Sequence, residues 1–274
     1  MPDAAVDHIA RAFDLRGCPD TFTRTCAATI VGRMIDHVRD LASVRDATDR
    51  LLTAATKLNN DSIAEPSRLP GWTRGHVLAH VARNADALVN VLAGRPMYAS
   101  AETRDADIER DAPRALAAQL TDVRESAGRF EAQAAVPADW SRTITMRNGV
   151  TDSASRVPFR RWIEVDLHHV DLGIGYELED LSEEFTQREI NFLADRFRDA
   201  PGLPAVAIRQ DDGRTLFTGA VQGFTEEQVR SGAEPAWDIT VSGRQADLLG
   251  WLAGRRDGSA LTAEGGLLPA LPPL

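Results

Sequence analysis

Apolar residues recur at helical spacing from Ile35 onward, and no other feature of the chain constrains its fold as strongly. Steps of three to four residues match the turn of an α-helix, so the apolar side chains gather on one face of it. In the first such segment these residues are Val38, Leu41, Val44, Ala47, Leu51 and Ala55. Further segments with helical signals follow, and together they predict an antiparallel bundle of four helices.

Residues that start and stop helices set the bounds of the next two bundle helices. Thr73 stands where an N-cap is expected, and its helix is predicted to end at Leu92, because Gly94-Arg-Pro96 follows. The third helix is predicted to run from Pro113 to Ala135, with proline in its first turn. Residues 97–112 lie between these helices and are predicted to form a long loop, a feature that is usually functional or disordered.

A hairpin and a helix complete the predicted bundle. Residues 142–147 and 150–151 have strand-like composition, and Asn148-Gly149 between them is typical of a β-hairpin turn. The fourth helix is predicted to run from Ser153 to Leu172 and to end at Gly173.

The pattern changes after Gly175, where short β-like segments appear. One helix is predicted over residues 182–198 and another over 244–253, and the proline- and leucine-rich tail at 265–274 is expected to be irregular. Strands are predicted over residues 205–209, 215–218 and 237–241. This mixture indicates a small α+β domain.

The sequence therefore predicts an α+β protein, with a four-helix bundle over residues 35–180 and a small α+β domain over 181–274. Residues 1–34 are interpreted as an extension, to which we assign no role. Cys18 and Cys26 are the only cysteines, so the main body holds neither a disulfide framework nor an all-cysteine zinc site. We interpret both as reduced thiols rather than a bridge or a ligand pair, and we do not expect them to act in catalysis.

Charge and hydropathy exclude several classes of function. The chain has a net charge of −10 at pH 7, whereas a nucleic-acid-binding face needs an excess of lysine and arginine. No apolar run approaches the roughly 18 residues of a membrane helix, and the start lacks the features of a signal peptide. We expect a cytoplasmic protein, a monomer or weak homodimer, that binds neither nucleic acid nor membrane.

Histidines cluster in two of the predicted helices. Four of the six in the chain fall in Gly71–Asn84 and Arg161–Gly173. At about 100° per residue, His80 lies at the edge of the apolar stripe of its helix with Asn84 one turn further along, whereas His76 points toward the polar side. His80 is therefore the better candidate for an inward-facing ligand.

The second stretch offers a carboxylate and an imidazole on one helix face. Glu164 and His168 are four residues apart and project from the same side, whereas His169 points roughly 100° away. Asp171 is either an ordinary polar residue at the helix end or a partner that orients an imidazole. Together with His80, this pair suits zinc, with a fourth position open to water or substrate.

Each of these residues also has an ordinary structural explanation. His80 alone could be a hydrogen-bonded core residue, and Glu164 with His168 could be a solvated pair on a helix surface. The combination of two imidazoles and a carboxylate is what favours the metal site.

Several segments match a known pattern in order and spacing: Leu69–Leu88, Pro96–Arg104, Glu164–Gly173 and Trp237–Gly243. They resemble the mycothiol-dependent maleylpyruvate isomerase family, and the resemblance extends from about Ile35 to the end of the chain. It implies a DinB-like four-helix bundle followed by a small C-terminal domain, the same architecture that the residue pattern predicts.

The resemblance also implies the residues of the site. It places the ligands of one zinc ion per chain on His80, Glu164 and His168, the choice that helix geometry makes independently. It places a catalytic arginine on Arg104, which alone would be interpreted as a surface charge in a mobile loop. Asn84, one turn from His80, is predicted to orient the thiol or the substrate.

Mycothiol is the thiol cofactor that the resemblance implies. Lys57 is the only lysine in an arginine-rich chain, which indicates high-GC coding of the kind found in actinobacteria, and a cysteine-free main body fits a borrowed thiol. The implied activity is the conversion of maleylpyruvate to fumarylpyruvate in gentisate degradation, by reversible addition of a zinc-activated thiolate.

Two other functions stay open on the sequence. A mycothiol S-transferase would use the same zinc thiolate on an electrophilic toxin or biosynthetic intermediate. A non-catalytic bundle would bind a metal or a small molecule. The isomerase and the transferase share every predicted ligand and differ in their substrate contacts.

Overall fold

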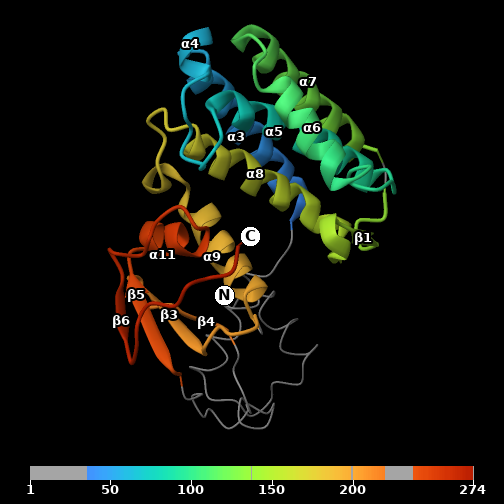
Figure 1. Ribbon diagram of the computed structural model, residues 1–274. Helices are drawn as coiled ribbons and strands as arrows, with labels where there is room; N and C mark the ends of the chain where they lie inside the picture. Colours follow the sequence, from blue (N-terminus) through green and yellow to red (C-terminus); the bar gives the residue numbers. More distant parts are fainter. Residues whose placement is uncertain (1–35, 137, 199, 220–236, 274) are drawn as a thin grey trace, which may run out of the picture.

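The computed structural model describes residues 36–273 except 137, 199 and 220–236 (Figure 1). The extension at 1–34 and both of its cysteines lie outside the described residues. The described part has a helical N-terminal region and a smaller C-terminal domain with a mixed sheet. This confirms the predicted α+β class.

Four long helices form the N-terminal bundle, and their apolar faces meet in its core. They are α3 (His37–Ala55), α5 (Arg74–Leu92), α7 (Leu116–Ala134) and α8 (Val157–Asp171). Helix α5 packs against both α7 and α8, and α3 packs against the same two helices. The predicted bundle is therefore present, with α5 and α8 as neighbours.

Helix α5 begins where the sequence predicts, because its first turn is capped by local side chains. The Thr73 hydroxyl accepts a hydrogen bond from the backbone N–H of His76, and the His76 imidazole accepts one from the backbone N–H of Thr73. Such a reciprocal cap satisfies backbone donors that the helix itself leaves without partners. It fixes the start of the helix that carries His80.

The prediction of a long loop at residues 97–112 is wrong. Helix α6 (Ala101–Asp111) occupies most of this segment, and the Ser100 side chain caps it. Only Ile108 and Asp111 are buried in α6, so the helix has almost no apolar stripe from which it could be predicted. The end of this segment packs closely on α5, since a Cβ at Gly75 would lie 2.2 Å from the carbonyl oxygen of Ala112.

Other bundle elements differ from prediction at their bounds. Helix α7 begins at Leu116 rather than Pro113, and a short helix, α4 (Asn60–Ile63), was not predicted. The hairpin is confirmed, with strands β1 (Thr143–Thr145) and β2 (Thr151–Ser153) pairing antiparallel. Helix α8 starts after residues 154–156, which form a single 3-10 turn.

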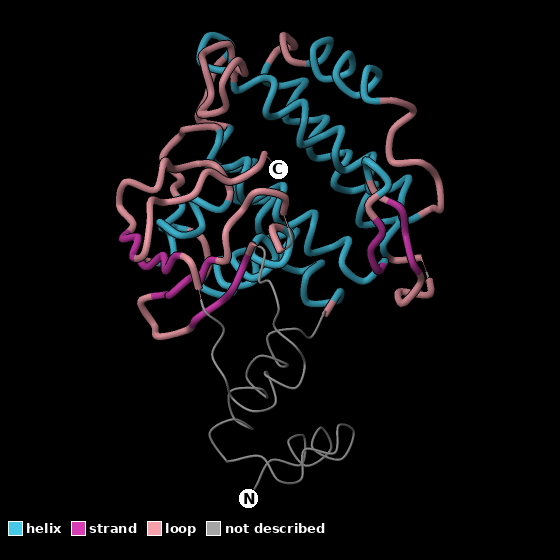
Figure 2. Tube along the Cα trace, turned by 60° about the horizontal axis from the view of Figure 1, so that its bottom comes forward, coloured by secondary structure: helices cyan, strands magenta, loops and turns pink. Residues whose placement is uncertain are grey.

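In the described part of the C-terminal domain, a four-stranded sheet carries two helices on one face. The helices are α9 (Glu183–Arg196) and α11 (Gln245–Leu252), and the strands are β3 (Val206–Gln210), β4 (Thr215–Thr218), β5 (Ile239–Gly243) and β6 (Thr262–Glu264). The strand order is β4-β3-β5-β6, with β3 parallel to β5 and both edge strands antiparallel to their neighbours. Strand β6 was not predicted. Figure 1 places α9 and α11 between the sheet and the bundle, and Figure 2 shows the sheet and the hairpin as two separate strand regions.

Buried contacts join the C-terminal domain to the bundle. Arg188 of α9 donates to both carboxylate oxygens of Asp40 of α3, at 2.5 and 2.8 Å, and Asp40 is fully buried. The rings of Phe185 and Trp162 pack with their centroids 5.2 Å apart. These contacts set α9 beside α8, the helix that carries Glu164 and His168. Among the described residues, no helix is long and apolar enough to cross a membrane.

Candidate metal centre

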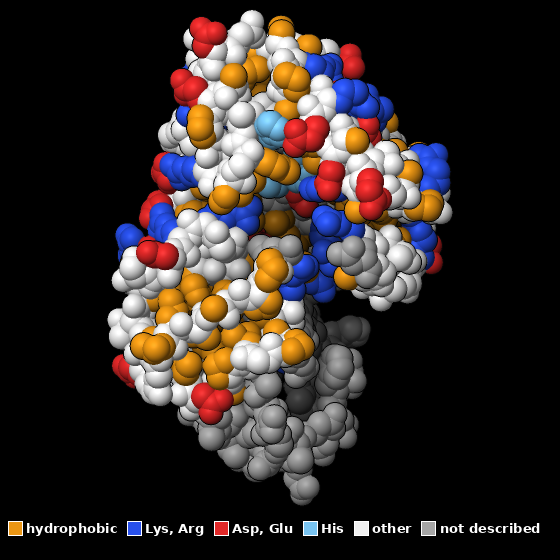
Figure 3. Space-filling view, viewed as in Figure 1, with side chains coloured by type: hydrophobic (Ala, Val, Ile, Leu, Met, Phe, Trp, Pro, Cys, Tyr) orange, Lys and Arg blue, Asp and Glu red, His pale blue; other side chains and the backbone are white. Residues whose placement is uncertain are grey.

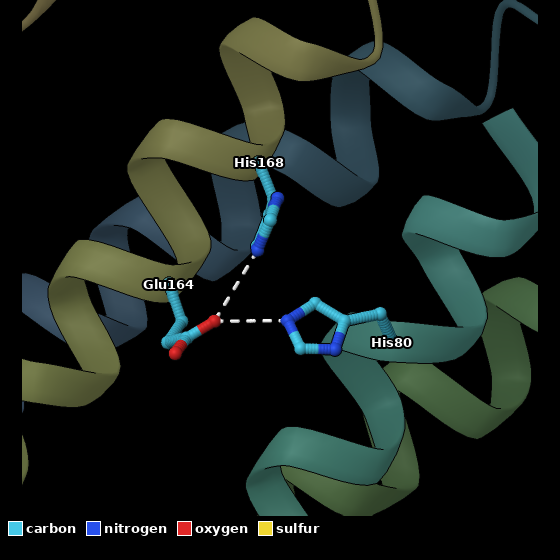
Figure 4. Close-up of side chains that lie close together, drawn as sticks. All are labelled: His80, Glu164 and His168. Atoms are coloured by element: carbon cyan, nitrogen blue, oxygen red, sulfur yellow. Dashed lines mark hydrogen bonds and ion pairs between the residues drawn. The ribbon is translucent and has the colours of Figure 1, made fainter. Parts of the chain in front are cut away.

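Three side chains from two bundle helices converge on one point (Figure 4). His80 comes from α5, and Glu164 and His168 come from successive turns of α8. One oxygen of Glu164, Oε2, lies 3.0 Å from Nε2 of His80 and 3.3 Å from Nε2 of His168. The three ligand atoms lie within 4.8 Å of one another.

The surroundings of His168 fix the direction of its ring. Its Nδ1 lies 2.8 Å from Oδ2 of Asp171, and that carboxylate is fully buried. An acceptor at this position takes the proton of Nδ1, so Nε2 is the ring atom that faces the centre and could bind a metal ion once its own proton is lost. Asp171 is thus the orienting partner that the sequence offered as one of two interpretations.

Burial and mutual contacts set the charges of the three groups. Burial lowers the pKa of His80 to about 4, and the neighbouring His168 adds to the effect. Burial alone would raise the pKa of Glu164, but hydrogen bonds with both imidazoles hold it well below its usual range. Hydrogen bonds to Asp171 and Glu164 outweigh burial and raise the pKa of His168. At neutral pH the centre therefore offers an ionised carboxylate and a neutral His80.

This donor set fits zinc. Two imidazoles and a carboxylate are the ligands found in catalytic zinc sites, which keep a further position open. The separations of 3.0 and 3.3 Å between Glu164 Oε2 and the two Nε2 atoms are close to those that two metal bonds of about 2.0–2.2 Å set in a tetrahedral site. The oriented Nε2 of His168 is a feature that metal-ligating histidines share.

Arg104 lies at this centre even though it belongs to a helix rather than a loop. Its Nη2 is 3.3 Å from Nδ1 of His80, and its guanidinium lies over the Tyr98 ring, 6.0 Å from the centroid. Its Nη1 donates to the Asp105 carboxylate at 2.6 Å. Helix α6 thus brings to His80 the arginine that sequence reasoning placed in a mobile loop.

Asn84 is buried, and its carbonyl oxygen already has a partner. Arg161 of α8, itself fully buried, donates from Nη1 to Oδ1 of Asn84 at 2.9 Å and to the carbonyl oxygen of Val81 at 2.8 Å. Burial lowers the pKa of Arg161 to about 10. Asn84 also lines the cavity beside the metal ligands, so a role toward thiol or substrate stays a prediction.

The two other histidines of the motifs do not join the centre. His76 caps its own helix, and its Nε2 lies 3.3 Å from the Glu109 carboxylate. His169 is buried and stacks on Tyr176, with the ring centroids 4.0 Å apart. Both observations agree with the helix geometry that favoured His80 and His168.

A cavity of about 470 Å³ opens beside the three ligands and is lined by both parts of the molecule. Figure 3 shows the corresponding hollow, with histidine side chains above it and basic side chains on either side. We call His80, Arg104, Glu164 and His168 the bundle wall, and Glu189, Arg196 and Arg255 the C-terminal wall. Tyr98, Arg147 and Arg160 also line the cavity.

Sequence reasoning missed the C-terminal wall. Glu189 and Arg196 are seven residues apart on α9, a spacing that places them on one helix face, and this signal was available in the sequence. Arg255 lies beyond α11, and its Nη2 donates to the Asp171 carboxylate at 2.9 Å. Nothing local in the sequence relates Arg255 to a carboxylate 84 residues earlier.

Two family models match the chain. One is described as the mycothiol maleylpyruvate isomerase N-terminal domain and matches residues 44–173, and the other is the C-terminal domain of the same family and matches residues 180–273. Together they cover most of the chain. The chain belongs to the mycothiol maleylpyruvate isomerase family.

Solved structures support the fold of this family member. The crystal structure of a mycothiol-dependent maleylpyruvate isomerase matches with a TM-score of 0.74 and 24% identity, over 87% of this chain and 97% of that one. A histidine-to-alanine mutant of the mycothiol-dependent maleylpyruvate isomerase gives the same values. A comparison with curated protein sequences finds no match.

Proposed function

We propose that this family member is a zinc- and mycothiol-dependent cis–trans isomerase that converts maleylpyruvate to fumarylpyruvate. The observation that carries the proposal is the cluster of His80, Glu164 and His168 at one end of an arginine-lined cavity. A cation site beside anion-binding side chains suits an acidic substrate and a thiol that must lose its proton. Family membership supports the same reading.

The three ligands would hold the zinc ion. When bound, zinc supplies a Lewis acid that lowers the pKa of a thiol, so that a thiolate is present at neutral pH. Glu164 would contribute one negative charge, and the two Nε2 atoms that face its Oε2 would be the imidazole donors. Asp171 keeps His168 in the required orientation through its Nδ1.

Metal binding by His80 also has a consequence for Arg104. An arginine can only donate, so the contact of Nη2 with Nδ1 of His80 requires Nδ1 to accept. A metal-bound His80 would carry its proton on Nδ1, so Nδ1 would no longer accept from Arg104. The guanidinium would then be available to a substrate anion.

The proposed reaction needs charge stabilisation more than proton transfer. Mycothiol, when bound, would supply a sulfur that adds reversibly to the cis double bond, so that this bond becomes single, can rotate and re-forms as trans when the thiol leaves. During that addition negative charge would gather on the conjugated carbonyl oxygen of the substrate. Arg104 would stabilise the negative oxygen, and the other cavity arginines would hold the substrate carboxylates.

The test is turnover by the zinc-loaded protein with mycothiol and maleylpyruvate. We expect fumarylpyruvate to form only when the thiol is present, with no thiol consumed. Formation of the product at an equal rate without the thiol, or no product from zinc-loaded protein with it, would contradict the proposal.

A mycothiol S-transferase is the second candidate, and the size of the binding region favours it. A further cavity of about 580 Å³ shares Met97, Tyr98, Met146 and Arg147 with the cavity at the metal ligands. A region of this extent could take a substrate larger than a small diacid. If the protein accumulates mycothiol adducts of electrophiles and leaves maleylpyruvate unchanged, the transferase is the correct function.

A further inference from the structure

Glu189 is a buried carboxyl group that the proposed function does not use. It lies on α9 with 1% of its surface exposed, and it lines the cavity beside the metal ligands. Its Oε2 has no hydrogen-bond partner among the described residues. A buried polar oxygen without a partner costs stability, so its presence in a cavity wall points to a ligand that completes it.

The charged groups around Glu189 come from three parts of the chain. Arg160 and Glu164 face it from α8, Arg255 from the segment after α11, and Arg196 from its own helix. Arg160 donates twice to Oδ2 of Asp152, at 2.8 and 2.6 Å, and Arg255 donates to Asp171. Two of the three arginines therefore already have carboxylate partners other than Glu189.

The surroundings of Glu189 favour its protonated form. Burial raises its pKa to about 8, against the opposing effect of the arginines, and the charge of Glu164 adds to the rise. A protonated carboxyl is a hydrogen-bond donor, whereas a carboxylate only accepts. Enzymes use carboxyl groups held neutral in this way to donate to negatively charged oxygens.

We propose that the Glu189 carboxyl donates a hydrogen bond to an anionic oxygen of the substrate bound in the cavity beside His80, Glu164 and His168. The class of substrate, an unsaturated diacid, rests on the proposed function. Among arginines, a neutral acid adds a donor without repelling the carboxylate or enolate oxygen that they attract. An ionised Glu189 would repel the same oxygen.

The pH dependence of substrate binding follows from the protonation of Glu189. Below the pKa of about 8 Glu189 is a donor and the anion binds; as the pH rises through that value, the donor is lost and a negative charge replaces it. Binding of a diacid therefore weakens on the alkaline side. Glutamine at this position keeps a donor and stays neutral at every pH, so it removes this alkaline weakening.

The raised pKa of Glu189 also makes the stability of the folded protein depend on pH. A carboxyl whose pKa is raised on folding supports the folded state fully at pH values below its unfolded pKa, and this contribution is lost as the pH rises through the folded pKa. Glu189→Gln has no such loss, so its Tm should exceed that of the wild type by an increasing margin as the pH rises. A purely structural glutamate, hydrogen-bonded as a carboxylate, would give the opposite result.

Calorimetric titration of the zinc-loaded protein with maleate, without thiol, tests the proposal. We expect Glu189→Leu to weaken maleate binding roughly ten- to hundredfold at neutral pH, because a hydrogen bond to a charged group is lost. Glu189→Gln should bind nearly as the wild type does at neutral pH and show no weakening across pH 8. Glu183→Gln, an exposed position on the same helix, is the matched control and should behave as the wild type.

Infrared difference spectra between wild type and Glu189→Gln supply a readout that needs neither substrate nor turnover. We expect the C=O stretching band of a protonated carboxyl at neutral pH and its loss as the pH passes about 8. Wild-type maleate affinity in Glu189→Leu, or an ionised Glu189 at neutral pH, would overturn the inference. A protein that binds maleate through Glu189 but does not isomerise maleylpyruvate refutes the proposed function alone.

Discussion

The bundle wall and the C-terminal wall face the same cavity but are built in opposite ways. In the bundle wall, one carboxylate oxygen bridges two imidazoles, and His168 is held from behind by Asp171. In the C-terminal wall, Glu189 is buried with an oxygen that has no partner among the described residues. A wall with oriented ligands is ready for a cation, whereas a wall of arginines and a neutral acid is ready for an anion. The difference indicates that the bundle wall supplies the cation site, whereas arginines of both walls and Glu189 surround the place for an anion.

Removal of a bundle-wall ligand should have the largest effect. We expect His80→Ala to lose its zinc and with it all measurable isomerase activity, because two ligands do not make a stable zinc site. Metal analysis of the purified protein measures this directly. His76→Ala, one turn earlier on α5, is the control and should keep its zinc. Equal zinc content in the two variants would contradict the assignment of His80 as a ligand.

Arg104→Ala should separate metal binding from catalysis. The variant is expected to keep its zinc and its fold while kcat falls about a hundred- to a thousandfold, the usual effect of losing one donor to a developing oxyanion. Steady-state kinetics with metal analysis is the measurement. Arg110→Ala on the exposed side of the same helix is the control, and its kinetics should match the wild type.

Asp171→Asn should have an intermediate effect, since Asp171 contacts both walls. We expect zinc affinity to fall about ten- to hundredfold, because the orienting partner of His168 is weakened. Competition with a chelator gives the affinity. Unchanged zinc affinity would show that the orientation of His168 does not depend on this carboxylate.

The smallest effect on the site should come from the junction between the two parts. Asp40→Asn breaks a buried ion pair with Arg188 and should lower the free energy of unfolding by about 3 kcal/mol, with little change in zinc per folded chain. Denaturant unfolding measures it. Arg39→Ala removes the neighbouring exposed pair with Glu184 and should cost less than about 1 kcal/mol; an equal cost would mean that the Asp40 pair does not fix the junction.

The sequence predicts elements whose signals are local. Thr73 and the apolar stripe that follows define α5, and the four-residue spacing of Glu164 and His168 defines their common face. Helix α6 was missed because only two of its side chains are buried, and β6 because its three residues, Thr262–Glu264, are mostly exposed and carry no apolar run. By the same local signals the three candidate ligands of the bundle wall could be predicted from helix geometry, whereas Arg104 was placed only by the family resemblance. The C-terminal wall depends on how α9 docks against α8.

The central claim is that the bundle wall presents an external thiol on a metal ion. Cobalt-substituted protein titrated with mycothiol tests it most directly, because cobalt bound to a thiolate gives a sulfur-to-metal charge-transfer band. We expect this band to saturate at one thiol per metal ion in the wild type and to be absent in His80→Ala. A cobalt spectrum in the wild type that does not change on addition of mycothiol would contradict the account.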